Sequence, residues 1–169
     1  MKAIILSTIF TLTAWAITIG EIPKEISLSG DNGGLVTGET WQSSSIKDKV
    51  YMLIYVDPDE KDVNEHFIQA LKKKEYDKTL FGTMAIINLG ATWKPNFIIE
   101  KILNSKQEEF PNTIYAKDKN KLLVDEWGLG DDASNILIFS KDAKLLFYKS
   151  GRMEDEDMQD AYRIIENNI

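Results

Sequence analysis

The sequence predicts an α/β protein with one mixed β-sheet flanked by helices. Apolar runs of strand length alternate with stretches of helical periodicity, in the order hairpin, β, α, β, α, β, short α, β-hairpin, α. Strands separated by helices pair in parallel through right-handed crossovers, whereas the closing hairpin makes one side of the sheet antiparallel. The 169 residues are enough for one domain with a substantial core.

The first 16 residues have the features of an export signal. Lys2 supplies a positive charge, an apolar run of about 11 residues follows, and Ala14-Trp15-Ala16 is a small-x-small cleavage site. The run is too short to span a bilayer. We therefore expect cleavage after Ala16, a periplasmic location, one domain over residues 17–169, and no membrane span in the mature form. The alternative is an uncleaved anchor or a buried N-terminal helix.

The next part of the chain predicts an edge hairpin and then the central strand. Residues 17–41 are rich in turn-forming glycines, and Ile26 and Leu28 alternate with polar residues, which is typical of short edge strands. Residues 50–56 form a continuous apolar run, as expected for a strand covered on both faces. Pro58 ends this strand, because proline cannot donate to the hydrogen-bond ladder.

Helices and strands alternate after that strand. A helix is expected over residues 61–74, with Asp59, Glu60 and Asp62 crowding its first turn, where carboxylates oppose the positive end of the helix dipole. The last helix is expected to have a similar acidic start over residues 154–157. Next come a strand over 83–89 and a helix that begins at Pro95 and has a broad apolar face. A strand over 113–116 and helical turns over 122–127 follow. The chain then forms a hairpin of 135–140 and 144–149 and a final helix after Gly151.

Composition excludes several classes of function. The chain has no cysteine, so a disulfide, a thiol nucleophile, a zinc–thiolate site and a cysteine-ligated iron–sulfur cluster are impossible. His66 is the only histidine, which excludes metal sites that need two or three histidines from one chain. The net charge of −7 argues against nucleic acid as a partner, because phosphate binding needs clustered Lys and Arg. The sequence predicts no cofactor.

The order of elements resembles the thioredoxin fold, in the extracytoplasmic branch that carries an added N-terminal hairpin. Residues 46–50 resemble the segment that leads into the central strand of those proteins, and residues 135–145 match their late strand and turn. Asp48 and Ala143 stand where glycine is common in that branch. The fold class expected from this resemblance is thioredoxin-like, with a mixed central sheet flanked by helices and an N-terminal β-hairpin extension.

The chain departs from catalytic thioredoxins at two places. The resemblance places a redox pair around residues 57–61, where no cysteine stands, and a cis-proline near Ala133 or Ser134, neither of which is proline. A Cys-x-x-Cys pair works because a helix N-terminus lowers a thiol pKa, and without sulfur that end of the helix is only a positive dipole end. Thiol–disulfide oxidoreductase and peroxiredoxin activities are therefore excluded.

Further residues make the chain similar to the YtfJ family of exported bacterial proteins. Gly20 and Pro23 after the signal, Trp41 and Ser43 before the central strand, and residues 127–129 fit its pattern. The resemblance spans nearly the whole mature chain. It implies a periplasmic thioredoxin-like fold and no established activity.

The loops at the carboxyl end of the sheet are the candidate binding surface, because such loops carry function in this kind of fold. Four of the candidate residues are acidic and could hold calcium, but their spacing is not that of the twelve-residue calcium loop. Helix capping is therefore favoured, and no metal is expected. The candidate rim consists of Asp57, Asp59, Glu60, Asp62, Ala133, Ser134 and Asn135.

The sequence favours a binding protein over an enzyme. A fold retained without its reactive groups predicts an exported, non-catalytic protein that binds a periplasmic protein partner or a small ligand. The alternative is a non-thiol enzyme or redox-associated factor that uses His66 and nearby carboxylates as acid and base. Trp41, Trp93 and Trp127 are expected in the core or as hairpin anchors, and an exposed cluster of them would indicate a protein-binding surface.

Overall fold

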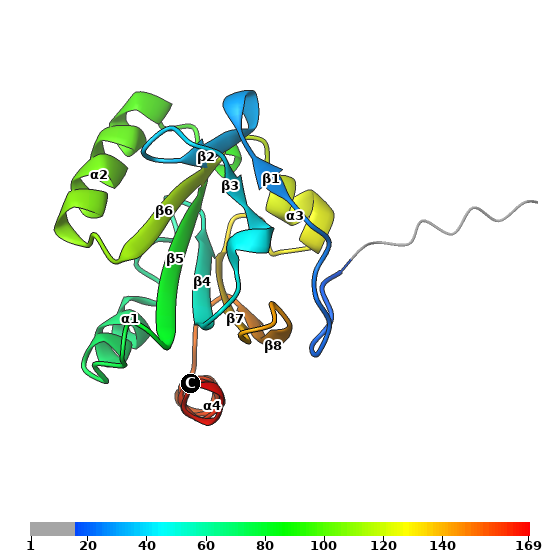
Figure 1. The fold of residues 1–169 in the computed structure, drawn as a ribbon. Helices are drawn as coiled ribbons and strands as arrows, with labels where there is room; N and C mark the ends of the chain where they lie inside the picture. The colour runs from blue at the N-terminus through cyan, green and yellow to red at the C-terminus, as the bar shows by residue number, and fades with distance from the viewer. Residues whose placement is uncertain (1–15) are drawn as a thin grey trace, which may run out of the picture.

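A six-stranded mixed sheet forms the centre of the protein (Figure 1). The computed structural model describes residues 16–169, so the predicted export signal lies outside the described residues except for Ala16. The strand order is β2–β6–β5–β4–β7–β8. The strands are β2 (Gly33–Leu35), β4 (Val50–Val56), β5 (Phe81–Asn88), β6 (Thr113–Asp118), β7 (Ser134–Phe139) and β8 (Leu145–Ser150).

The direction of each strand follows from the connection before it. β4, β5 and β6 run parallel to one another, because helices connect them. β7 pairs antiparallel with β4, and β8 pairs antiparallel with β7. β4 therefore lies between a parallel and an antiparallel neighbour, and six of its seven residues are buried, as its continuous apolar run predicts.

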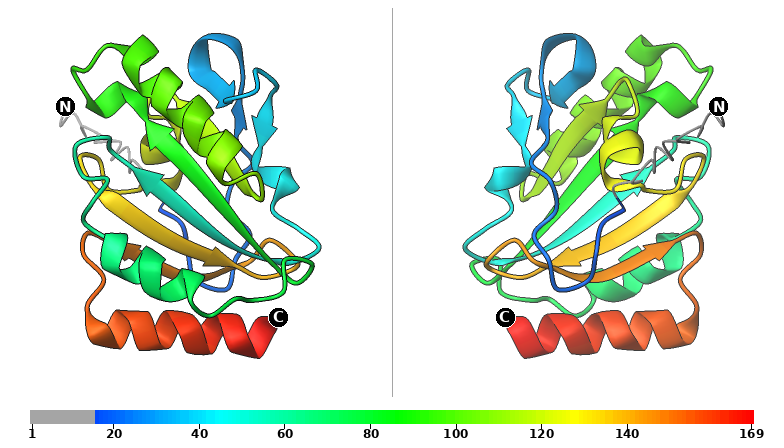
Figure 2. Two further views of the ribbon diagram at one scale, coloured as in Figure 1. Left: turned by 90° about the vertical axis from the view of Figure 1, so that its left-hand side faces the viewer. Right: turned by 90° about the vertical axis from the view of Figure 1, so that its right-hand side faces the viewer.

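Helices cover the two faces of the sheet unequally. One face carries α1 (Glu65–Lys72), α2 (Asn96–Glu109) and α4 (Asp155–Asn168), and the other carries α3 (Leu122–Trp127) and the N-terminal segment (Figures 1 and 2). Side chains of β4 alternate between these two layers, with Val50 and Met52 toward α1 and α4. None of the helices within residues 16–169 is long and apolar enough to cross a membrane.

The N-terminal extension forms a separate two-stranded antiparallel sheet of β1 (Ser27–Leu28) and β3 (Trp41–Gln42). The glycine-rich turn between them places β2 at the edge of the main sheet, antiparallel to β6. A Cβ atom on Gly33 would lie 1.9 Å from the Lys117 carbonyl oxygen, so only glycine permits this close approach. The described residues also include three 3₁₀ turns, at Gly30–Asn32, Ser43–Ser45 and Leu89–Ala91.

The two acidic segments behave differently. The first predicted helix begins at Glu65 and not at residue 61, so the prediction that Asp59, Glu60 and Asp62 lie in its first turn is wrong. Residues 57–64 form successive turns, because Asp57 accepts a backbone hydrogen bond in its own turn and competes with helix formation. The prediction for α4 is confirmed, since Glu154 and Asp157 form a reciprocal capping box.

Two non-glycine residues take up the left-handed conformation at positions where the resemblance to the extracytoplasmic thioredoxin branch led us to expect glycine. Asp48 has a φ of 70° and Ala143 a φ of 64°. Ala143 closes the β7–β8 turn and donates its N–H to the Ser140 carbonyl oxygen at 3.0 Å. A side chain with a Cβ atom costs about 1–2 kcal/mol in this conformation, so these turns store strain.

We expect Ala143→Gly to stabilise the protein by about 0.5–1 kcal/mol, because relief of the left-handed strain exceeds the added entropy of the unfolded chain. Ala70→Gly within α1 is the matched control and should destabilise by about 1 kcal/mol. Urea unfolding followed by circular dichroism measures both. Destabilisation of similar size in both variants would contradict the assignment of strain to the turn.

Candidate functional site

Buried polar side chains gather at the carboxyl end of the parallel strands. Asp57 follows β4, Asn88 ends β5 and Asp118 ends β6, while Ser134 and Asn135 begin the antiparallel β7. These residues therefore meet at one edge of the sheet, where ligands bind in open α/β sheets. With Asn64, they make up six of the seven buried polar residues of the described chain, and Ser43 is the other.

Asn64 connects three loops at this edge through one buried amide. Its NH₂ group donates to Ser134 Oγ at 3.0 Å and to the Gly151 carbonyl oxygen at 2.9 Å. Its side-chain oxygen accepts the N–H of Met153 at 2.8 Å. The amide therefore holds the turn before α1 against the start of β7 and the loop before α4, a role that nothing in the sequence pattern predicted.

Asn135 has a similar role on the neighbouring loop. Its amide donates to the carbonyl oxygens of Tyr55 and Gly130, and its oxygen accepts the N–H of Gly130 at 2.9 Å. The Tyr148 hydroxyl donates to the same oxygen at 3.1 Å. Asn135 is fully buried, so it acts as a fixed support below the surface.

Tyr55 of β4 and Asp118 at the end of β6 form a buried hydrogen-bonded pair at the same edge. The Tyr55 hydroxyl donates to Asp118 Oδ2 at 3.1 Å, and the N–H of Leu123 donates to the same oxygen at 2.9 Å. Burial, followed by the charge of Asp118, raises the pKa of Tyr55 far above its usual value. The phenol therefore stays protonated and serves as a donor that fixes the start of α3.

The two segments of the predicted rim do lie side by side. The N–H of Asp57 donates to the Ala133 carbonyl oxygen at 3.0 Å, which brings residues 57–62 and 133–135 together. Their exposure differs, however. Asp57, Ser134 and Asn135 are buried, whereas Asp59 and Asp62 are exposed and Glu60 and Ala133 are half-buried. Only the exposed and half-buried residues of the rim can contact a partner directly.

Carboxylates outnumber cations around Asp57. Burial raises the pKa of its carboxyl group most, and Asp59, Asp132 and Asp131 add to the rise. Asp57 Oδ1 accepts the N–H of Asp59 at 2.8 Å, which opposes the shift without cancelling it. Asp57 therefore carries a charge that its surroundings disfavour.

Two lysines from neighbouring loops partly balance these carboxylates. Lys94 pairs with Asp59, and Lys121 pairs with Asp131 at 2.5 Å. Asn88 donates its amide to Asp131 at 3.0 Å, while its own side-chain oxygen is buried without a hydrogen-bond partner among the described residues. The rim is thus tied to the loop after β5, a connection that the sequence did not reveal.

His66 lies on α1 with its ring directed at the loop before α4. Its Nε2 atom donates to the Met153 carbonyl oxygen at 2.8 Å. No ion pair between His66 and a carboxylate occurs within residues 16–169. The ring therefore shares the Met153 segment with Asn64, and the structure does not bring it together with Glu65 or Asp62.

The tryptophans separate into core and surface. Trp41 and Trp127 are buried as predicted, but Trp93 is 86% exposed. Phe97, Ile98 and Ile102 of α2 are exposed beside it in sequence. We call these four residues the α2 patch. The signal for this patch in the sequence is the broad apolar face of the helix predicted after Pro95, because one helix cannot bury all of its faces against a sheet.

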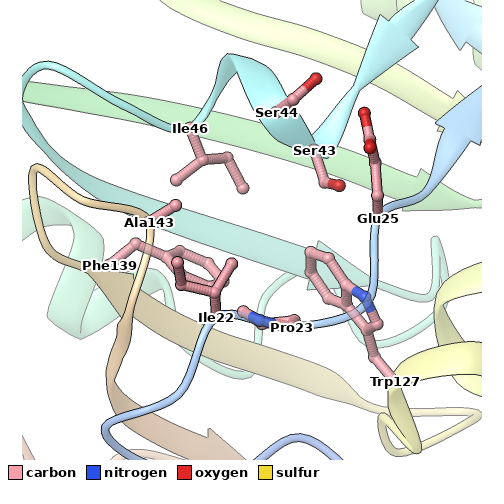
Figure 3. A pocket seen from close by; sticks show the side chains of 9 residues that line it. All are labelled: Ile22, Pro23, Glu25, Ser43, Ser44, Ile46, Trp127, Phe139 and Ala143. Atoms are coloured by element: carbon pink, nitrogen blue, oxygen red, sulfur yellow. The ribbon is translucent and has the colours of Figure 1, made fainter.

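A small cavity of about 130 Å³ lies on the other face of the protein (Figure 3). Ile22, Pro23, Ile46 and Phe139 point into it. Its volume is well below the ~300 Å³ at which ligand pockets begin. The cavity is therefore a packing defect between the N-terminal segment and the β7–β8 hairpin. Within residues 16–169, no cluster of three or more acidic or histidine side chains is arranged to hold a metal ion.

Comparisons with known proteins identify relatives of the whole chain. A family described as "Bacterial protein of unknown function (YtfJ_HI0045)" matches residues 18–168. An uncharacterised protein of Haemophilus influenzae is 23% identical over 176 residues, covering 96% of this chain and 94% of its own. The uncharacterised protein YtfJ of Escherichia coli is 22% identical and covers 76% of this chain and 71% of its own.

Solved structures with a thioredoxin-like fold are similar to this one at low sequence identity. A thiol peroxidase from Chromobacterium violaceum has a TM-score of 0.64 at 9% identity, and 90% of this chain and 88% of that chain are covered. A putative thiol:disulfide interchange protein DsbE from Chlorobium tepidum has a TM-score of 0.61 at 14% identity, with coverages of 90% and 99%. The predicted thioredoxin-like fold, with an N-terminal two-stranded sheet, is confirmed.

We expect Asp57→Asn to raise the free energy of unfolding at pH 7, because asparagine keeps the acceptor for the Asp59 N–H and removes a disfavoured charge. The folded-state pKa of Asp57 is raised, so its cost is present above that pKa and disappears as the pH falls toward the unfolded value of ~3.9. The gain of the variant should therefore shrink on acidification. Asp62→Asn, at an exposed residue of the same loop, is the control, and an equal gain in both variants would contradict the prediction.

Proposed function

We propose, from the premise that this chain belongs to the YtfJ_HI0045 family of bacterial proteins and has a thioredoxin-like fold, that it is an exported, non-catalytic protein that binds a protein partner. The observation that carries this proposal is the α2 patch, which lies next to the polar edge of the sheet. The partner is expected to cover the patch and the exposed part of the rim together.

The polar edge supports a scaffold role and not catalysis. The turn that would hold a redox pair contains no cysteine and is fixed by the Asn64 amide. Asn135 and Tyr55 likewise use their polar atoms in hydrogen bonds within the protein. Groups that are already satisfied in this way hold loops in place but do not offer a reactive atom to a substrate.

The α2 patch supports protein binding. Trp93 is 86% and Phe97 72% exposed, and aromatic side chains are the residues most enriched at interface cores. Thr92 and Lys94, on either side of Trp93, both hydrogen-bond Asp59. The loop that carries Trp93 is therefore held against the rim, and one partner can contact both.

Export is supported by the N-terminal sequence. A positive residue, a short apolar run and a small-x-small site are the three parts of a secretory signal. A cysteine-free chain also folds without depending on the redox state of the compartment that receives it. We therefore place the function in the periplasm.

The proposal is tested by site-specific photocrosslinking in cells that express the full sequence. A benzophenone amino acid at position 97 should give a discrete crosslinked partner, whereas the same probe at position 22 should not, because Ile22 is 62% exposed, against 72% for Phe97, and lies on the other face of the protein. Trp93→Ala in the purified protein should weaken binding of that partner at least tenfold, as is usual for a central aromatic contact. The same partner at both positions, or none at position 97, would refute the proposal.

A further inference from the structure

A groove with a volume of about 760 Å³ lies between α1 and α2. Both helices lie on the same side of the sheet (Figure 2, left). The groove is lined by the amino-terminal half of β5, from Phe81 to Ala85, whereas the rim follows the carboxyl end of the strands. It is therefore a separate surface from the proposed partner site. We propose that it binds a free single-chain amphiphile with an anionic head group, such as a fatty acid.

Small side chains on β5 create the groove. Strand pairing places Ala85 between Ile54 and Tyr115, and Thr83 between Met52 and Thr113. These two rows face the helices. Ala85 is the smallest residue of its row, and the Thr83 hydroxyl is hydrogen-bonded to that of Thr113 at 2.9 Å. Ala85 and Thr83 remain partly exposed there, while Met84 and Ile86 on the opposite face of the same strand are fully buried. The floor thus combines apolar side chains with one pair of mutually hydrogen-bonded threonine hydroxyls, and Ala85 and Thr83 in it remain partly exposed.

Apolar side chains from the two helical segments form the sides of the groove. Ile68 and Leu71 of α1 line one side, and Phe110 at the end of α2 lines the other. A volume of about 760 Å³ lies inside the ~300–1,000 Å³ range of ligand pockets and exceeds what a single side chain of a partner would fill. A flexible alkyl chain can follow the strand rows along this floor, because dispersion contacts and burial do not depend on direction.

Two ammonium groups converge at one end of this floor. Lys72 Nζ lies 4.4 Å and Lys106 Nζ 5.0 Å from the centre of the Phe110 ring. Lys106 also pairs with Glu109 at 2.8 Å, but Lys72 forms no ion pair within residues 16–169. An anionic head group placed here would meet one free ammonium and one shared with a carboxylate.

The local charge is opposite to that of the whole chain. Four lysines and three glutamates line the groove, although the full sequence has 20 basic and 27 acidic residues. Of the three glutamates, Glu109 pairs with Lys106, Glu65 accepts from Gln69 at 2.5 Å, and Glu75 follows the end of α1. The lining therefore has a net charge of +1, and Lys72 beside the Phe110 ring is the group that favours an anionic head group over a cationic one.

The test compares two ligands of equal chain length and opposite charge, both used below their micelle concentrations. Isothermal titration calorimetry of the purified protein should show saturable binding of laurate at one site. Dodecyltrimethylammonium should bind at least tenfold more weakly. Amide resonances of Thr83, Ala85 and Tyr115 should shift on addition of laurate, which places the ligand in the groove and not on the α2 patch.

Two substitutions probe the floor and the head-group site separately. Ala85→Phe fills the floor and should abolish laurate binding, while circular dichroism reports whether the variant remains folded. Lys72→Gln should weaken laurate binding about tenfold and should not weaken the binding of dodecyltrimethylammonium, because the substitution removes a charge that repels this cation. Lys73→Gln, at the next residue but outside the groove lining, is the matched control and should have no effect.

Several results would overturn the proposal. Equal affinity for the two ligands would remove the head-group preference, and resonance shifts confined to Trp93 and Phe97 would move the site elsewhere. A dimer in sedimentation that Ala85→Phe disrupts would identify a second copy as the occupant. Binding of the protein to phosphatidylglycerol vesicles without binding of free laurate would identify a membrane surface instead. If Ala85→Phe does not fold, the lysine pair and the resonance shifts still decide the question.

Discussion

The need to satisfy buried polar groups at the carboxyl end of the sheet is the constraint on which the rest of this structure depends. The parallel strands β4, β5 and β6 all end at that edge of the sheet, and the antiparallel strand β7 starts there. The loops that follow must turn sharply under neighbouring helices, so their backbone groups cannot all reach water. Asn64 and Asn135 provide the partners, and each does so with both ends of its amide.

This arrangement changes what the edge can do. In a redox protein of the same fold, the turn after the central strand must leave sulfur atoms accessible. Here α1 begins only at Glu65, and the residues before it form hydrogen-bonded turns that Asn64 holds in place. This turn contains no cysteine, and the three hydrogen bonds of the Asn64 amide hold it in place. Exposed side chains on the loop after β5, above all Trp93, are then displayed from a fixed support.

Much of this fold could be predicted from the sequence, because the signals were local. The apolar run of β4, the periodicity of α4 and the acidic start of α4 each act within a few residues. The start of α1 could not be predicted in this way, since Asp57 stabilises a competing turn whose partner loop is distant in sequence. The rim residues lie at the carboxyl end of the sheet, as the sequence suggested, and their role in binding stays a prediction. Which of them are buried depends on contacts across 70 and more positions, as between Asn64 and Ser134.

The α2 patch and the groove both border α2. Ile99 and Leu103 bury one stripe of this helix against the sheet, and a stripe of that width is all that one helix can bury. Ile98 and Ile102 are spaced four residues apart on one flank, and Lys106, four residues further on, lines the groove. The exposed flank and the groove wall therefore belong to one side of the helix. Polar residues at positions 98 and 102 would leave the fold intact, because neither side chain contributes to the core, so their apolar character is best explained by a contact made outside the chain.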